Sequence, residues 1–347
     1  MNNDDFSILS IFTNIVGKKN MLVGDKETLF YRKGIRIGEG VAIAVLFPET
    51  LMQFWNLLNI CVEEDKIIII QAANTGLTGG STPYGEDYER DVVIINTLKI
   101  DKLILIKQGL QAVAFPGTTL YQLEDKLSAI GRSPHSVIGS SCIGASVIGG
   151  ICNNSGGNLV KRGPAYTELA LYAKLNKDGK LELVNELDIE LGASPEEIIL
   201  NLQNVNFDST NVYETHKKAS DIEYQKRVKD VNANTPARFN ADKRRLYNAS
   251  GCAGKLAVFA VRLDTFPKPE KEQVFFVGTN DPNNFTALRK KLLTSIDNIP
   301  DMGEYMHRSY FDGSDKYCKD NFLLIKYLGT SFLPILLLLK RKLNNLF

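Results

Sequence analysis

Short apolar runs and polar breaks alternate along the amino-terminal part of the chain, and their spacing predicts its first elements. The aliphatic run at 41–47 predicts a buried strand that ends at Pro48. Apolar residues then recur at helical spacing as far as Val62, before a charged stretch. The next strand is predicted at 67–70, so residues 41–73 form a strand–helix–strand unit.

Antiparallel strands are favoured further along. Short strands are predicted at 92–95 and 113–115, and a helix is predicted over 118–130. Residues 168–186 and 254–266 alternate or run apolar, which suits an antiparallel sheet.

Polar composition separates these two segments, and a proline-rich boundary follows them. Residues 196–250 are polar and charged, which predicts a long insertion over the surface. Pro267 and Pro269 mark the end of a first domain, at about residue 268. A strand at 274–278 and a helix at 284–296 then begin a second domain, so the expected class is α+β.

Composition narrows the class of protein. The 347 residues carry a net charge of +1, so no overall field favours nucleic acid. Five scattered cysteines without a His cluster predict reduced thiols and neither a disulfide framework nor a metal site. The acidic amino terminus has no apolar signal core, and no apolar stretch reaches the about 18–20 residues of a membrane span.

Two glycine-rich loops carry the candidate chemistry. Directly after the strand at 67–70, residues 71–81 read Q-A-A-N-T-G-L-T-G-G-S. Residues 139–157 are similar, with glycine interspersed with Ser, Asn and small apolar residues. Such loops bring backbone N–H groups close to phosphates, and two of them can surround an extended dinucleotide. Neither loop has the G-x-G-x-x-G pattern of a Rossmann dinucleotide site or the G-x-x-x-x-G-K-[ST] pattern of a nucleoside triphosphate site, so the sequence predicts a cofactor site of another type.

These loops and several longer motifs resemble a known family. The motifs are Y-R-K-G at 31–34, R-D-V-V-I-I at 90–95, P-G-T-T-L-Y at 116–121, R-G-P-A-Y-T-E at 162–168, G-C-A-G-K at 251–255 and G-E-Y-M-H-R at 303–308. Over residues 5–330 they resemble the FAD-dependent D-2-hydroxy-acid dehydrogenases, and most of all the respiratory, quinone-dependent D-lactate dehydrogenases of bacteria. The resemblance implies a two-subdomain FAD-binding domain of the vanillyl-alcohol-oxidase (PCMH) type over residues 1–268. It also implies that residues 269–330 start an antiparallel α+β cap domain.

The resemblance assigns cofactor contacts residue by residue. One side of the FAD would be held by the first loop, through Ala72, Ala73, Asn74, Thr75, Gly76, Gly80 and Ser81. The other side would be lined by Gly139, Ser146 and Gly156, with Val258 contacting it from a later strand. The stretch at 79–81 contains neither His nor Cys, so the expected FAD is non-covalent.

Candidates for substrate chemistry are few, because the chain has three histidines. A base must take the 2-hydroxyl proton and a cation must hold the carboxylate. His307 and Arg308 are the suggested pair, with a local structural role as the alternative. His135 is expected to be a structural or flavin-edge residue rather than the base, and His216 a solvated surface residue. The basic clusters around Arg227 and Arg244 are expected to form a solvated face, with anionic lipid as the alternative partner.

The resemblance also implies an activity. It is the oxidation of D-lactate to pyruvate, with electrons passing to a membrane quinone at the cytoplasmic face of the inner membrane. After Thr330 the sequence is expected to leave the family, and 331–347 reads as an aberrant apolar and basic tail. We therefore expect the amino-terminal part of a longer enzyme, with a complete small protein as the alternative. Other readings are another FAD-linked D-2-hydroxy-acid dehydrogenase and an inactive FAD-binding fragment.

Overall fold

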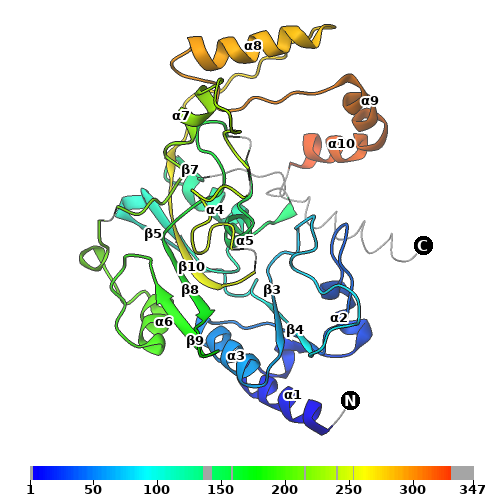
Figure 1. Cartoon of the computed structure of the whole chain (residues 1–347), viewed down its shortest axis with the longest axis vertical. Helices are drawn as coiled ribbons and strands as arrows, with labels where there is room; N and C mark the ends of the chain where they lie inside the picture. Colours follow the sequence, from blue (N-terminus) through cyan, green and yellow to red (C-terminus); the bar gives the residue numbers. More distant parts are fainter. Residues whose placement is uncertain are drawn as a thin grey trace.

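Two β-sheets and the helices packed on them form the body of the protein (Figure 1). The computed structural model describes residues 3–135, 143–157, 159–214, 216–239, 241–252 and 254–329. The predicted α+β class is confirmed.

The first sheet has four strands in the order β1-β2-β4-β3. Its strands are β1 (Met21–Leu22), β2 (Ala44–Leu46), β3 (Ile67–Gln71) and β4 (Val92–Asn96), and β2, β4 and β3 are parallel. Helices α1 (Asn3–Val16), α2 (Asp25–Arg32) and α3 (Leu51–Glu63) belong to this part of the chain. The predicted strand–helix–strand unit is confirmed as β2-α3-β3, although β4 lies between its two strands.

The second sheet is antiparallel, as expected, with the order β5-β6-β10-β8-β9. Helix α4 begins after Thr119, whose side chain forms a capping box with Gln122. The short pair β7–β11 extends this part. The bounds are β5 Leu103–Ile106, β6 Gln111–Ala114, α4 Leu120–Ser128, β7 Arg132–Ser133, α5 Val147–Cys152, β8 Ala170–Leu175, β9 Leu181–Asn185, β10 Ala257–Asp264 and β11 Phe266–Pro267.

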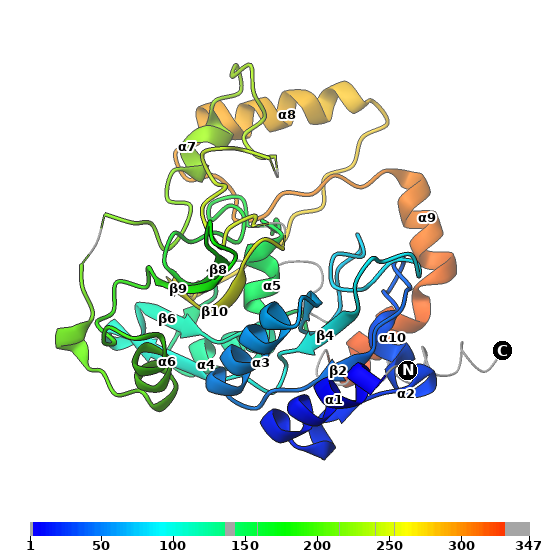
Figure 2. The same ribbon diagram turned by 60° about the horizontal axis from the view of Figure 1, so that its bottom comes forward.

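Strand β10 contributes to both hydrophobic cores. Phe259 belongs to the core that also contains α3, and its ring lies 4.7 Å from that of Phe54. Val258 belongs to the other core, which contains residues of α4 and α5. Successive strand residues point to opposite faces, so the central strand is covered on both sides. Helix α3 accordingly lies between the two sheets (Figure 2), and its aromatic contacts join the two subdomains.

The predicted surface insertion begins later in the chain than expected. Helix α6 (Pro195–Asn204) buries Ile198, Ile199 and Leu202 in the α3 core. The prediction that residues 196–204 lie over the surface was therefore wrong, because the apolar side chains at helical spacing face α3. The remaining polar segment contains η4 (Ser209–Asn211) and the short helix α7 (Tyr224–Lys229).

The carboxy-terminal part of the described chain is helical. The helices are α8 (Pro282–Ser295), α9 (Arg308–Tyr317) and α10 (Lys319–Leu328), and α8 lies beside α7 (Figure 1). The predicted strand at 274–278 was wrong: no described strand pairs with it, and Phe276 is 96% exposed. None of the helices within the described ranges is both long and apolar enough to cross a bilayer. The segment 331–347 lies outside the described residues.

Candidate functional site

The first glycine-rich loop leaves the sheet at the end of β3 and is held by its own side chains. Asn74 has φ 51°, a left-handed conformation that Asn tolerates. Its amide nitrogen donates to the Lys33 carbonyl at 2.9 Å, and its amide oxygen accepts from the Ser81 hydroxyl at 2.8 Å. Gln71 donates to the carbonyls of Tyr31 and Ser81 at 2.8 and 2.7 Å. These bonds fix both ends of the loop.

The backbone of this loop is open on one side. No atom lies within 4 Å of where a Cβ would stand on Gly76 or Gly80. Only Gly79 of the three glycines has a positive φ, at 73°. Gly76 is therefore not required by the turn itself. What remains is open space beside small residues and backbone N–H groups, which fits the pyrophosphate of FAD.

The second loop packs on the α4–α5 side of the second sheet. The Ser146 hydroxyl caps α5 by accepting from the Gly149 N–H at 3.1 Å, and the residue is 5% exposed. Val258 lies buried in the core that α5 covers. Gly139 lies outside the described residues. Contacts of these three residues with FAD stay predictions.

Arg238 meets the second loop, and the sequence analysis did not single it out. A Cβ atom at Gly156 would overlap the Arg238 guanidinium, so only glycine permits this approach. Arg238 makes no ion pair or hydrogen bond with any other residue that the structure describes. A cation without a carboxylate partner thus lies on a loop assigned to the cofactor. No local sequence pattern distinguishes it within the polar insertion.

His135 lies between the two glycine-rich loops in the sequence, and in the structure it is buried, with 3% of its surface exposed. Burial, aided by the nearby Arg162 charge, lowers the pKa of His135 to about 4, so its imidazole is neutral at neutral pH. Its Nδ1 atom has no hydrogen-bond partner among the described residues. Arg162 donates to the Pro134 carbonyl at 2.6 Å and lies 4.5 Å from the centre of the Phe266 ring. This environment agrees with a structural or flavin-edge residue.

The other histidines have local surroundings. His216 is exposed, as expected. His307 caps α9, because its Nδ1 atom accepts from the Ser309 N–H at 3.1 Å. Arg308 is 81% exposed along its side chain and pairs with Asp312 at 2.7 Å. The catalytic roles of His307 and Arg308 stay predictions, and both residues have the local contacts that were their alternative.

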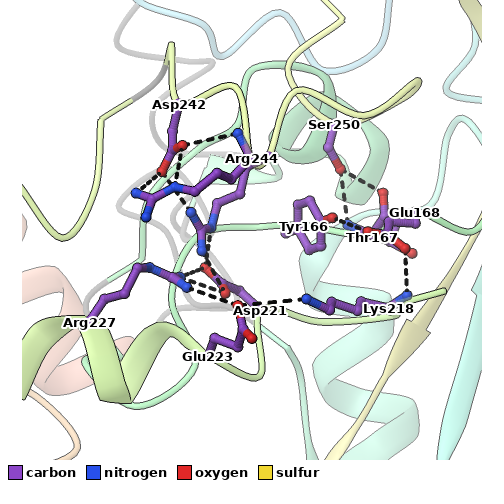
Figure 3. Close-up of polar contacts among 11 residues, drawn as sticks. Tyr166, Thr167, Glu168, Lys218, Asp221, Glu223, Arg227, Asp242, Arg244 and Ser250 are labelled. Atoms are coloured by element: carbon purple, nitrogen blue, oxygen red, sulfur yellow. Dashed lines mark hydrogen bonds and ion pairs between the residues drawn. The ribbon is translucent and has the colours of Figure 1, made fainter. Parts of the chain in front are cut away.

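The basic clusters of the insertion are divided between a solvated face and a buried ion network (Figure 3). Lys226, Lys243 and Arg244 are exposed, as expected, whereas the side chains of Arg227 and Arg245 are largely buried. Asp221 is 5% exposed and accepts from Arg227 at 2.6 Å and Arg245 at 2.5 Å. Arg245 also pairs with Asp242 at 2.7 Å, and Asp242 pairs with Arg244. The acidic residues between the basic ones do neutralise them, as expected, but by folding the insertion onto itself.

A polar cavity of about 530 Å³ lies at the opposite end of the first sheet from the first loop. It is lined by residues before β2, β3 and β4, among them Asp65, Lys66, Arg90 and Asp91. These charges pair with one another, Lys66 with Asp91 at 2.7 Å and Arg90 with Asp65 at 2.6 Å. The cavity is therefore separate from the glycine-rich loops.

Two protein families match the chain. The FAD binding domain family matches residues 42–183, which contain both glycine-rich loops. The family described as D-lactate dehydrogenase, membrane binding, matches residues 274–347. The second match runs past Thr330, so the expectation that the resemblance stops there was wrong.

Solved structures show the fold. The chain is similar to p-cresol methylhydroxylase, with 17% identity and a TM-score of 0.50 over 78% of this chain and 45% of that one. It is also similar to alkyldihydroxyacetonephosphate synthase, with 13% identity and a TM-score of 0.50 over 78% of this chain and 41% of that one. The FAD-binding domain is thus of the expected PCMH type.

Full-length relatives are much closer in sequence. The chain is 55% identical to the quinone-dependent D-lactate dehydrogenase of Escherichia coli over 97% of this chain and 59% of that one. It is 53% identical to the Haemophilus influenzae protein of the same name, over 98% of this chain and 60% of that one. The chain is a homologue of the quinone-dependent D-lactate dehydrogenases, spans about three fifths of their length and carries an FAD-binding domain of the PCMH type.

Proposed function

We propose that this chain binds FAD non-covalently and is the cofactor-binding part of an enzyme that oxidises D-lactate to pyruvate, with electrons passing to a membrane quinone. The observation that carries the proposal is the preformed first loop, with its open backbone beside Gly76 and Gly80, in a chain 55% identical to a protein of that name. Other FAD-linked D-2-hydroxy-acid oxidation is the second candidate, since the same loops would serve it.

The first loop would hold the pyrophosphate and ribitol through residues 72–76, Gly80 and Ser81. Asn74 and Ser81 have their side chains engaged with each other, so their backbone N–H groups are the donors left for phosphate. Gly139, Ser146, Gly156 and Val258 are proposed for the opposite side. When bound, FAD would accept the hydride from C2 of the substrate.

Arg238 is proposed as the anchor for the substrate carboxylate. Its guanidinium has no carboxylate partner among the described residues and rests on Gly156 of a flavin loop. Guanidinium groups bind carboxylates through two parallel hydrogen bonds, which fixes orientation as well as affinity. His307 and Arg308 remain candidates for base and anchor if the rest of the enzyme brings them to the flavin.

Non-covalent attachment follows from the residues near the first loop. The stretch 79–81 has no nucleophile. The Cys152 thiol is engaged with Cys252 on the α5 side. Acid precipitation of the folded protein should release all of its FAD into solution. Yellow colour retained by the washed precipitate would contradict this.

A membrane surface is the proposed partner of the carboxy-terminal helices, at the cytoplasmic face of the inner membrane. Helices α9 and α10 expose Tyr310, Phe311, Phe322 and Tyr327 at 54–73%, with Lys316, Lys319 and Lys326 beside them. Aromatic and basic side chains together favour the interface of an anionic bilayer. The chain should co-sediment with anionic vesicles, and deletion of 331–347 tests the tail: unchanged binding would leave α9 and α10 as the contact.

The experiment for the whole proposal compares this chain with a version extended by the family's carboxy-terminal region. FAD content measures cofactor binding, and a dye-coupled assay with several D-2-hydroxy acids measures turnover. We expect both proteins to bind FAD and the extended one to prefer D-lactate. Loss of a base alone costs about 10²–10⁴-fold, so the short chain should be slow. No bound FAD in either protein would refute the proposal, and preference for another acid would favour the second candidate.

A further inference from the structure

Two cysteines that are 100 positions apart in the sequence meet at the junction of α5 and β10. Cys152 is the last residue of α5, and Cys252 precedes β10. Their thiol groups interact with each other, and the ionisation of one affects that of the other. The residues just before them are also joined, because the Gly251 N–H donates to the Ile151 carbonyl at 3.0 Å. The backbone therefore places the two cysteines beside each other.

The backbone around Cys252 has little freedom to move away. Gly251 has φ 68°, and a Cβ there would come within 2.7 Å of Leu246. The Lys255 N–H donates to the Cys252 carbonyl at 3.1 Å, which closes the turn before β10. On the other side, Cys152 packs against the core formed by α4, α5 and β10. The meeting of the two thiols is thus part of the packed structure.

The two thiols differ in reactivity. Interaction with the Cys152 thiol, helped by the backbone at Gly254 and Leu256, lowers the pKa of Cys252 to about 7. Donation to Cys252 and burial raise the pKa of Cys152. Near pH 7 Cys252 therefore has a substantial thiolate fraction, whereas Cys152 remains a thiol. Cys252 is partly exposed, and it is the thiol that a small oxidant has to reach.

We propose that Cys152 and Cys252 form a redox-active pair that hydrogen peroxide converts into a disulfide. The Cys252 thiolate attacks one oxygen of the peroxide, the O–O bond breaks, and a sulfenic acid and hydroxide form. The Cys152 sulfur then attacks the sulfenic sulfur, loses its proton, and water leaves as the S–O bond breaks. Two thiols lose two electrons, and one peroxide becomes two waters.

The bond would join the carboxy-terminal end of α5 to the segment that enters β10. Ser146 at the start of α5, Gly156 just beyond it and Val258 in β10 are all positions assigned to the second side of the flavin. Oxidation would hence link the second glycine-rich loop covalently to the strand beneath it. A thiol reductant would reverse the change.

Two other described cysteines provide internal comparisons. Cys61 is fully buried in the α3 core, and burial raises its pKa to about 12, so it should not react. Cys318 is exposed between α9 and α10 and has no thiol partner among the described residues. Cys318 should therefore be oxidised only to single-sulfur products or to links between chains.

The experiment is peptide mapping of the folded protein after brief treatment with hydrogen peroxide at neutral pH and alkylation of the remaining thiols. Trypsin places Cys252 in peptide 246–255 and Cys152 in peptide 133–161, which also contains Cys142. We expect the two peptides to be linked, with fragmentation assigning the bond to Cys152, and dithiothreitol to release them. Cys142→Ser should keep the link, and Cys152→Ser and Cys252→Ser should each abolish it.

Three outcomes would overturn the proposal. The first is a disulfide to Cys252 that starts from Cys142 and not from Cys152. The second is that Cys152 and Cys252 are both still alkylated as free thiols when Cys318 has already been oxidised. The third is a linked peptide that forms only after the protein has been unfolded in urea. Fragmentation of the wild-type peptides decides the question even if a serine variant fails to fold. The readout needs neither FAD nor turnover, so it is independent of the proposed enzymatic function.

Discussion

Substitution of Asp221 by Asn tests the ion network that closes the insertion. Asp221 accepts two hydrogen bonds from Arg227, at 2.7 and 2.6 Å, and two from Arg245, at 2.5 and 3.1 Å. Asp221 lies about midway along the insertion and Arg245 near its end, so their pairing folds the second half of the insertion back on itself. Asn would keep one acceptor oxygen and turn an NH₂ group toward two guanidinium groups.

The cost follows from what remains of the network. Arg227 would keep only Glu223, at 3.7 Å and 62% exposed, and Arg245 would keep Asp242. The side chains of Arg227 and Arg245 are 15% and 7% exposed, so a net positive charge would remain buried. Removing one partner of a buried pair costs about 3–5 kcal/mol. At roughly 2–4 °C for each kcal/mol, the melting temperature should fall by roughly 6–20 °C.

Thermal denaturation and limited trypsin digestion would measure the effect, with cleavage after Arg238 and Lys243 reporting opening of the insertion. The matched control is Asp230→Asn, which makes the same chemical change at an exposed position of the same segment. Surface substitutions of this kind change stability by about 0.5 kcal/mol or less. Equal melting temperatures and equal cleavage rates for Asp221→Asn, Asp230→Asn and the wild type would refute the reasoning.

Three further predictions concern the cofactor loops and His135. Gly76→Val should fold normally, because its Cβ meets no atom within 4 Å, but it should raise the Kd for FAD roughly 100-fold, about 2.7 kcal/mol. Gly278→Val is the control, and unchanged FAD affinity in Gly76→Val, or the same loss in the control, would show that the loop is misassigned. Arg238→Met should retain FAD but bind oxalate roughly 10–100-fold more weakly, as measured by the change in the flavin spectrum, because one charged hydrogen-bonded contact of about 1.5–3 kcal/mol is lost. Loss of FAD instead would assign the guanidinium to the cofactor phosphate, and Arg289→Met on α8 is the control. The pKa of His135 is lowered to about 4 in the folded protein, so between pH 6.5 and 4 the unfolded chain binds a proton at this residue that the native state does not bind. The free energy of unfolding should therefore fall as the pH drops from 6.5 toward 4. In denaturant titrations, His135→Gln should remove this part of the pH dependence, and His216→Gln should leave it intact.

The fold could be read from the sequence where apolar periodicity and turn residues agree. The β2-α3-β3 unit and the antiparallel strands β8, β9 and β10 lie where they were expected. The strand at 274–278 failed because apolar residues alone do not make a strand, which needs a partner for its main-chain groups. Helix α6 was missed as a core element because Glu196 and Glu197 at its start gave it a polar character.

The candidate site divides in the same way. The first loop was predictable because glycine and hydroxyl residues directly after a β-branched run have few other uses. Arg238 was not, since its importance comes from its contact with Gly156, far away in the sequence. The burial of Arg227 and Arg245 was missed for the same reason: charge alternation along the chain does not reveal which charges will meet after folding.

The central position of β10 also determines when this domain can assemble during translation. Strand β6 ends at Ala114 and β8 at Leu175, but both pair with β10, which begins only at Ala257. At roughly 5–20 residues per second, on the order of ten seconds separate synthesis of β6 from that of its partner. During this interval the edges of β6 and β8 are exposed in the nascent chain, and such non-local pairing is slow. Nascent-chain folding should therefore show its main transition only after residue 264 has left the ribosome exit tunnel, and chaperones that cover unpaired strand edges should act before that point.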